Sequence, residues 1–132
     1  MFRTRYVYNQ APHSKSIIPD NVLSHQIKGG WNPEDGVVYK DINQQIDQAF
    51  ANVELALKDA QGKGWSQVFK VISYHLPLNE EALEAMLRNF KKYMPDHKPI
   101  WSCVGVTRLA LDDMRIEIEV VAHDPEGNSD AK

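Results

Sequence analysis

Apolar residues that recur every three or four positions predict two amphipathic helices. The first covers residues 42–61. Its repeating positions are Ile42, Ile46, Ala49, Phe50, Val53, Leu57 and Ala60. Asp41 is a suitable N-cap residue, and Gln44 at the third helical position completes a capping box. Gly62 and Gly64 are expected to end the helix, because glycine readily adopts the left-handed conformation found there.

The second helix is expected between Asn79 and Pro95. Asn79 is a favourable N-cap, and Pro95 cannot continue a helix. The acidic residues Glu80 and Glu81 suit the positive end of the helix dipole. The predicted buried stripe consists of Leu83, Met86, Leu87 and Phe90.

Strands are predicted where the period is two or where β-branched residues cluster. Residues 114–123 alternate most clearly. Met114, Ile116, Ile118 and Val120 point one way, and Arg115, Glu117, Glu119 and Val121 point the other way. Residues 66–76 and 100–106 are further strands, 21–30 is a weaker one, and 5–9 is a short edge strand. Residues 10–20, which contain two prolines, are expected to form a loop with extended pieces.

This order of elements predicts an α+β fold, a two-layer sandwich with two helices on one face of a mixed sheet. Residues 1–124 are expected to form a single domain, and 125–132 a flexible tail. The second face of the last strand carries both charged and apolar side chains. Such a face is covered by another subunit, borders a cleft or faces solvent, and the pattern alone leaves these open.

Charge and composition exclude several classes of protein. The net charge is −3, which argues against a nucleic-acid partner. No stretch is apolar enough for a membrane span or a secretory signal, so no membrane partner is expected. Cys103 is the single cysteine, which fits a reducing compartment. The expected location is the cytoplasm, with the mitochondrion not excluded, and a small molecule is the expected partner.

Few residues indicate chemistry by themselves. The five histidines form no local pair, so neither a metal site nor a cofactor is predicted. Cys103 lies among apolar residues and is interpreted as a small buried residue rather than a nucleophile. Trp31 and Trp101 are interpreted first as core or interface residues. Glu117 could manage a proton or orient a water molecule if a cleft buried it.

The segment "PIWSCVGVTRLALDDMRIEIEVVA" is similar to the signature of the Rid family, also called the YjgF or endoribonuclease L-PSP family. Upstream, "GGWNPEDGVVYKDINQQIDQAFANVELAL" resembles the family's turn and first helix, and "VFKVISYHLPLNEEALEAM" its next strand and second helix. The resemblance covers about residues 12–122.

This resemblance implies a chorismate-mutase-like fold and a homotrimer with ligand sites between subunits. Members of the deaminase branch hydrolyse reactive imines or enamines without a cofactor. The glutamate that matches Glu117 is thought to position the attacking water. The candidate substrate-binding residues are Trp101, Cys103, Trp31, Gly30, His13 and Glu84.

Two departures from the family pattern change the expected chemistry. Trp101 stands where the family has a carboxylate-binding arginine. Its single N–H cannot replace a bidentate guanidinium. His13 stands where the family has a pocket tyrosine. The predicted function is therefore hydrolysis of an imine, enamine or related reactive metabolite other than a simple 2-imino acid. A non-catalytic trimer that binds a metabolite is the alternative, and a ribonuclease or translation inhibitor is the weakest one.

Overall fold

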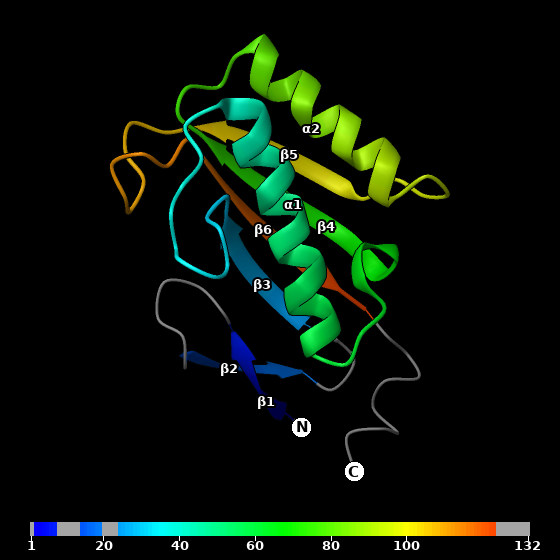
Figure 1. The fold of residues 1–132 in the computed structure, drawn as a ribbon. Coiled ribbons are helices and arrows are strands. Elements are labelled where there is room, and N and C mark those ends of the chain that lie inside the picture. The colour runs from blue at the N-terminus through cyan, green and yellow to red at the C-terminus, as the bar shows by residue number, and fades with distance from the viewer. Residues whose placement is uncertain (1, 8–13, 20–23, 124–132) are drawn as a thin grey trace.

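The computed structural model describes residues 2–7, 14–19 and 24–123, with side chains described over 26–123 (Figure 1). The predicted site residue His13 and the predicted tail lie outside these ranges. The strands are β1 (Phe2–Val7), β2 (Ser14–Pro19), β3 (Ser24–Gly29), β4 (Val68–His75), β5 (Ile100–Gly105) and β6 (Ile116–Ala122). The helices are α1 (Ile42–Asp59), the short 3₁₀ helix η1 (Gly64–Gln67) and α2 (Glu80–Tyr93).

Four of the strands form one mixed sheet in the order β3-β6-β4-β5. β6 pairs antiparallel with both β3 and β4, whereas β5 pairs parallel with β4 and forms an edge of the sheet. Figure 1 shows α1 and α2 on the same face of this sheet. The predicted architecture of two helices on one face of a mixed sheet is therefore confirmed. We call the face without helices the open face.

β1 and β2 form a separate antiparallel pair. Residues 10–20 were predicted to form a loop with extended pieces, and Ser14–Pro19 within them is a regular strand, β2. Six consecutive residue pairs join β2 to β1. The backbone ladder thus stabilises a segment that its own proline-bounded sequence does not mark as a strand.

The core lies between β6 and the helices. Ile116, Ile118 and Val120 are fully buried, as their alternation along the strand predicted. Phe50 of α1 stacks on Trp65 with ring centroids 4.6 Å apart, and the Trp65 indole N–H donates to the Phe50 carbonyl at 2.9 Å. Burial of such aromatic pairs is a major stabilising contribution.

Asp41 caps α1 as predicted, because its carboxylate accepts a hydrogen bond from the Gln44 N–H at 2.9 Å. The prediction that glycine takes the left-handed conformation at the end of α1 was wrong for the residue that follows the C-cap Ala60. Gln61, not glycine, adopts the left-handed conformation there, with φ of 70°. Its N–H still bonds the Lys58 carbonyl, so the helix end is satisfied despite the less favourable residue.

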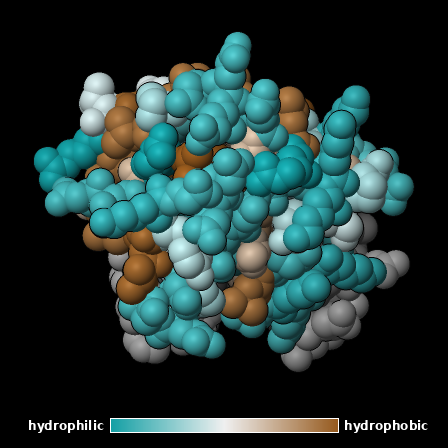
Figure 2. Space-filling model, turned by 45° about the horizontal axis from the view of Figure 1, so that its top comes forward, coloured by the Kyte–Doolittle hydropathy of each residue, from teal (hydrophilic) through white to brown (hydrophobic). Residues whose placement is uncertain are grey.

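Asn79 caps α2 as predicted, but the predicted buried stripe is only partly right. Met86 is buried, whereas Leu87 is 50% exposed, and Leu83 and Phe90 are half-buried. The residues that α2 buries are Ala82, Ala85, Met86 and Asn89. α2 presents small residues to its neighbours and leaves one large apolar side chain outside. Figure 2 shows apolar side chains emerging between hydrophilic ones on this side of the molecule.

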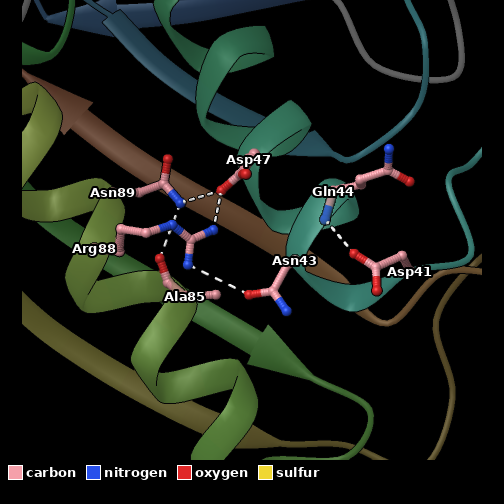
Figure 3. Close-up of polar contacts among 7 residues, drawn as sticks. All are labelled: Asp41, Asn43, Gln44, Asp47, Ala85, Arg88 and Asn89. Carbon is pink, nitrogen blue, oxygen red and sulfur yellow. Dashed lines mark hydrogen bonds and ion pairs between the residues drawn. The ribbon is translucent and has the colours of Figure 1, made fainter.

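A polar cluster joins the two helices (Figure 3). The Asp47 carboxylate of α1 accepts hydrogen bonds from Arg88 and from the buried Asn89 of α2. The Asn89 amide also donates to the Ala85 carbonyl at 2.9 Å, and Arg88 donates to Asn43 at 3.3 Å. The exposed ion pair between Arg88 and Asp47 adds little to stability. The buried Asn89 amide, in contrast, would be destabilising without its hydrogen-bond partners. The cluster therefore fixes how α2 sits beside α1.

Gln45, fully buried near the start of α1, connects segments that are far apart in the chain. Its amide N–H group donates to the carbonyls of Tyr39 at 2.6 Å and Asp113 at 3.1 Å. Its amide oxygen accepts from the backbone N–H of Arg115 at 2.6 Å and Ile116 at 3.2 Å. One side chain thus satisfies four backbone groups where two loops enter the core.

Candidate functional site

The candidate site is built around β5, the edge strand that contains Trp101 and Cys103. Ile100 is 70% and Val104 41% exposed, and Cys103 is also exposed. The interpretation of Cys103 as a buried residue was therefore wrong. Because β5 has a neighbouring strand on one side only, its apolar sequence does not imply burial.

Trp101 lies on the helix side of β5. Its ring meets Phe90 of α2 edge to face, with centroids 4.9 Å apart and planes at 83°. Its indole N–H donates to the hydroxyl of Ser73 on β4 at 2.9 Å. Two contacts of different kinds thus hold the indole in one orientation.

The hydrogen bonding continues from Ser73 to His75. The Ser73 hydroxyl lies 2.7 Å from Nε2 of His75, and both side chains are fully buried. Nδ1 of His75 has no hydrogen-bond partner among the described residues. Burial lowers the pKa of His75 to about 4, so the ring is neutral at physiological pH. We call these three residues the Trp–Ser–His chain.

Sequence reasoning missed Ser73 and His75, although a signal was present. Both alternate with Ile72 and Tyr74 in a predicted strand, and they share the parity of the core residue Val71. Polar residues at core positions of a strand need buried partners. Here they find one another and Trp101.

Glu117 lies on the open face of the sheet. It is half-buried, and burial raises the pKa of its carboxyl group, with a further rise caused by the charge of Glu119. Tyr74, beside them on β4, donates its hydroxyl hydrogen to Glu119 at 3.1 Å. Two carboxyl groups and a phenol therefore share a partly desolvated surface. A carboxyl group in such a place can accept a proton or hold a water molecule.

A single chain does not bring Glu117 and Trp101 together. Ile116 and Ile118 face the helices, so Glu117 faces away from them, whereas Trp101 packs under α2. Cys103 has the same parity as Trp101 and pairs in register with Ser73. Glu84, exposed on α2, lies one turn before Leu87 on the same flank of that helix. Trp101, Cys103 and Glu84 thus share the helix side of the sheet.

Gly30 and Trp31 directly follow β3, which lies at the opposite edge of the sheet from β5. A Cβ at Gly30 would overlap the Gln45 carbonyl, so the glycine permits close contact with α1. The Asn52 amide holds the Trp31 carbonyl at 2.8 Å. β6 and β4 separate β3 from β5, so these two residues do not meet Trp101 within one chain.

Lys28, a charged residue of β3, lies in the core. It is 2% exposed, and burial lowers its pKa to about 7, against an opposing effect of Asp59. It shares a parity with the buried Gln26, which places it on the helix side of β3. It therefore supplies no charge to the open face.

Metal and membrane sites find no support in the described part of the chain. No cluster of three histidine, cysteine or acidic residues is close enough to hold a metal ion among the described residues. Neither α1 nor α2 has the length and apolar character that crossing a bilayer requires.

Known proteins share this fold and sequence pattern. The model of the family described as endoribonuclease L-PSP matches residues 5–124. The RutC family protein YjgH of Escherichia coli is 33% identical over 93 residues, which is 70% of this chain and 69% of YjgH.

Two solved structures superpose over most of the chain. Yeast Mmf1 has a TM-score of 0.72 at 25% identity and covers 92% of this chain and 99% of its own. Escherichia coli TdcF with bound serine has a TM-score of 0.63 at 29% identity and covers 76% of this chain and 77% of its own. The chain belongs to the endoribonuclease L-PSP family, also called the YjgF or Rid family.

Proposed function

We propose that the protein is a homotrimeric hydrolase that acts on an imine, an enamine or a related reactive metabolite in a cleft between subunits. Glu117 orients the attacking water, and Trp101 and Cys103 of an adjacent subunit line the cleft. Gly30, Trp31, His13 and Glu84 are its proposed outer contacts. The proposal extends the family assignment to a reaction and a site.

The observation that carries the proposal is the position of Glu117. Its carboxyl group is half-buried on a sheet face that no helix covers, and its pKa is raised. It lies on the opposite side of the sheet from Trp101. A second copy that covers the open face would complete the burial of Glu117 and would supply the missing wall of a cleft.

The substrate class follows from Trp101. An indole N–H that already donates to Ser73 has no further donor for a substrate carboxylate. TdcF, a relative with bound serine, shows that an amino acid can bind to a protein of this fold. In this chain we expect instead a substrate with an uncharged or aromatic group that packs against the indole.

The test is the decay of imines generated by an amino-acid oxidase, with a panel of small, aromatic and carboxylate-free imines. The wild type should accelerate the decay of an aromatic or uncharged imine, and Glu117→Gln should reduce the rate by about 10²-fold or more. Light scattering should give a trimer for both proteins. Rapid hydrolysis of 2-aminoacrylate by the wild type would contradict the proposed substrate class.

The second candidate is a trimer that binds a metabolite without reaction. The fixed orientation of Trp101 favours it, because a locked apolar wall is suited to binding. A wild type inert towards every imine would support this candidate. Gain of activity on carboxylate imines by Trp101→Arg would then show that the scaffold is intact and that position 101 controls its use.

A further inference from the structure

A groove of about 760 Å³ lies between the end of α2, the segment that follows it and the start of β5. Its apolar wall consists of Leu87, Phe90, Met94 and Trp101. This volume falls within the range of about 300–1,000 Å³ that is usual for small-molecule pockets. All of its lining residues belong to one chain.

The apolar wall is preformed. The edge-to-face contact with Phe90 and the hydrogen bond to Ser73 hold the Trp101 ring in place. Pro95 and Pro99, which also line the groove, restrict the backbone of the connecting segment. A wall that is already ordered loses little conformational entropy when a ligand binds.

Leu87 shows that this wall is incomplete in the isolated chain. It occupies a predicted core position of α2, yet it is 50% exposed at the groove. Burial of a leucine side chain typically contributes about 1.5–3 kcal/mol, so its exposure leaves a favourable contact unused. An apolar ligand group in the groove would make that contact.

The charged residues of the groove favour an anion. Lys91 and Lys98 line it and are exposed, and no carboxylate pairs with either one in the part of the chain that is described. Asp96 is the single acidic lining residue. His97 is already engaged, because its Nε2–H donates to the Val68 carbonyl at 2.8 Å. Two lysines thus outnumber one aspartate beside an apolar wall.

We propose that this groove binds a small apolar carboxylate. The apolar body packs against Leu87, Phe90 and Trp101, and the carboxylate lies between Lys91 and Lys98. The site shares Trp101 with the proposed hydrolytic cleft, but it does not contain Glu117 and does not rest on the proposed function. Its shared wall, Trp101, would make occupancy of the groove visible at the indole.

The test uses 4-phenylbutyrate as the probe, titrated into the full chain by calorimetry and followed by the indole N–H signal of Trp101 in NMR spectra. Trp101→Phe assigns that signal. We expect saturable binding with one site per chain and a shift of the Trp101 signal. The alcohol 4-phenylbutan-1-ol has the same apolar body without the charge, and it should bind about tenfold more weakly.

Matched variants separate the groove from general surface charge. Lys91→Glu combined with Lys98→Glu should weaken binding of 4-phenylbutyrate by about tenfold or more, without changing binding of the alcohol by more than about twofold. Lys92→Glu is the control. It makes the same substitution at the position next to Lys91, with half of the double variant's charge change, but Lys92 lies over the Tyr93 ring outside the groove. It should leave both affinities within about twofold.

Two further variants complete the test. Leu87→Glu should abolish binding through the apolar wall, and Glu117→Gln should leave binding unchanged even where it abolishes hydrolysis. Circular dichroism confirms that each variant is folded. Absence of saturable binding to the wild type, equal affinity for the carboxylate and the alcohol, or an unchanged affinity in the double lysine variant would each overturn the proposal.

Discussion

The two helices cover the same face of the sheet, but they contact it in different ways. α1 buries nine of its residues, and its aromatic residue Phe50 is fully enclosed. α2 buries four, and its two aromatic residues, Phe90 and Tyr93, are only half-buried. α1 therefore closes the core, whereas α2 leaves a groove along one flank.

The polar groups beneath the two helices differ in the same way. Under α1, Gln45 satisfies four backbone groups where two loops enter the core. Beneath the α2 side, the Trp–Ser–His chain ends in a ring nitrogen without a described partner. The polar atoms of the Gln45 side chain are therefore satisfied, whereas Nδ1 of His75, close to the candidate residue Trp101, has no partner among the described residues.

The strongest test of this comparison is truncation of the two phenylalanines. Phe50→Ala should lower the free energy of unfolding by about 3–5 kcal/mol, because it removes a fully buried ring and leaves a cavity. Phe90→Ala should cost about half as much, because part of its ring is already exposed. Urea unfolding of both variants gives the two values. Equal losses would show that α2 closes the core as completely as α1.

Gln45→Met should cause a smaller loss of unfolding free energy than Phe50→Ala. It leaves two backbone carbonyls and two backbone N–H groups without the Gln45 side chain as their partner. We expect a loss of about 3 kcal/mol in unfolding free energy. Gln44→Met, at the exposed neighbouring position, serves as the control and should change stability by less than about 0.5 kcal/mol. If the Gln45 variant is as stable as this control, the hydrogen bonds of Gln45 do not stabilise the fold.

The next effect is confined to acidic pH. The pKa of His75 is about 4 in the folded chain, against 6.5 for a free side chain. Between pH 6.5 and pH 4, His75 is protonated in the unfolded chain but stays neutral in the folded chain. Its contribution to the free energy of unfolding is therefore fully present above pH 6.5 and decreases as the pH falls towards 4. In His75→Leu this part of the decline should disappear. Unfolding midpoints at several pH values measure the two slopes, and identical slopes would show that His75 is not the responsible group.

The smallest effect is expected at the groove. Leu87→Ala should lower the free energy of unfolding by less than about 1 kcal/mol, since half of the side chain is in contact with water. Its neighbour Met86 is fully buried, and Met86→Ala should cost about 2–5 kcal/mol. Thermal or urea unfolding distinguishes them. A large loss at Leu87 would mean that this residue belongs to the core, as the helix periodicity first indicated.

The fold was predictable where local patterns and tertiary packing agree. Asp41 and Asn79 cap the helices as their residue types predicted, and the alternation of residues 114–123 correctly divided β6 into two faces. The exposure of Leu87 was not predictable. Periodicity identifies the apolar side of a helix, but it does not show how far that side extends past the edge of a sheet. Strand β2 depends on pairing with β1, which its own residues do not reveal.

The candidate site was less predictable. Alternation placed Glu117 on the mixed face, where the structure also has it. For residues 100–106, apolar and small residues occupy both parities, so no pattern assigned Trp101 to the helix side. The role of Ser73 and His75 depends on the register between β4 and β5, which is a tertiary property. The separation of Trp101 from Glu117 within one chain could therefore be seen only in the folded structure.

The side chain of Gln45 also has a consequence for biosynthesis. Its partners at residues 113, 115 and 116 follow it by 68 to 71 positions. A growing chain on the ribosome can coil α1 early, but the anchor of its first turn stays incomplete until residues 113–116 have emerged. Such long-range closure delays the final docking step. The order of translation thus makes β6, the last strand among the described residues, the one that locks the first helix in place.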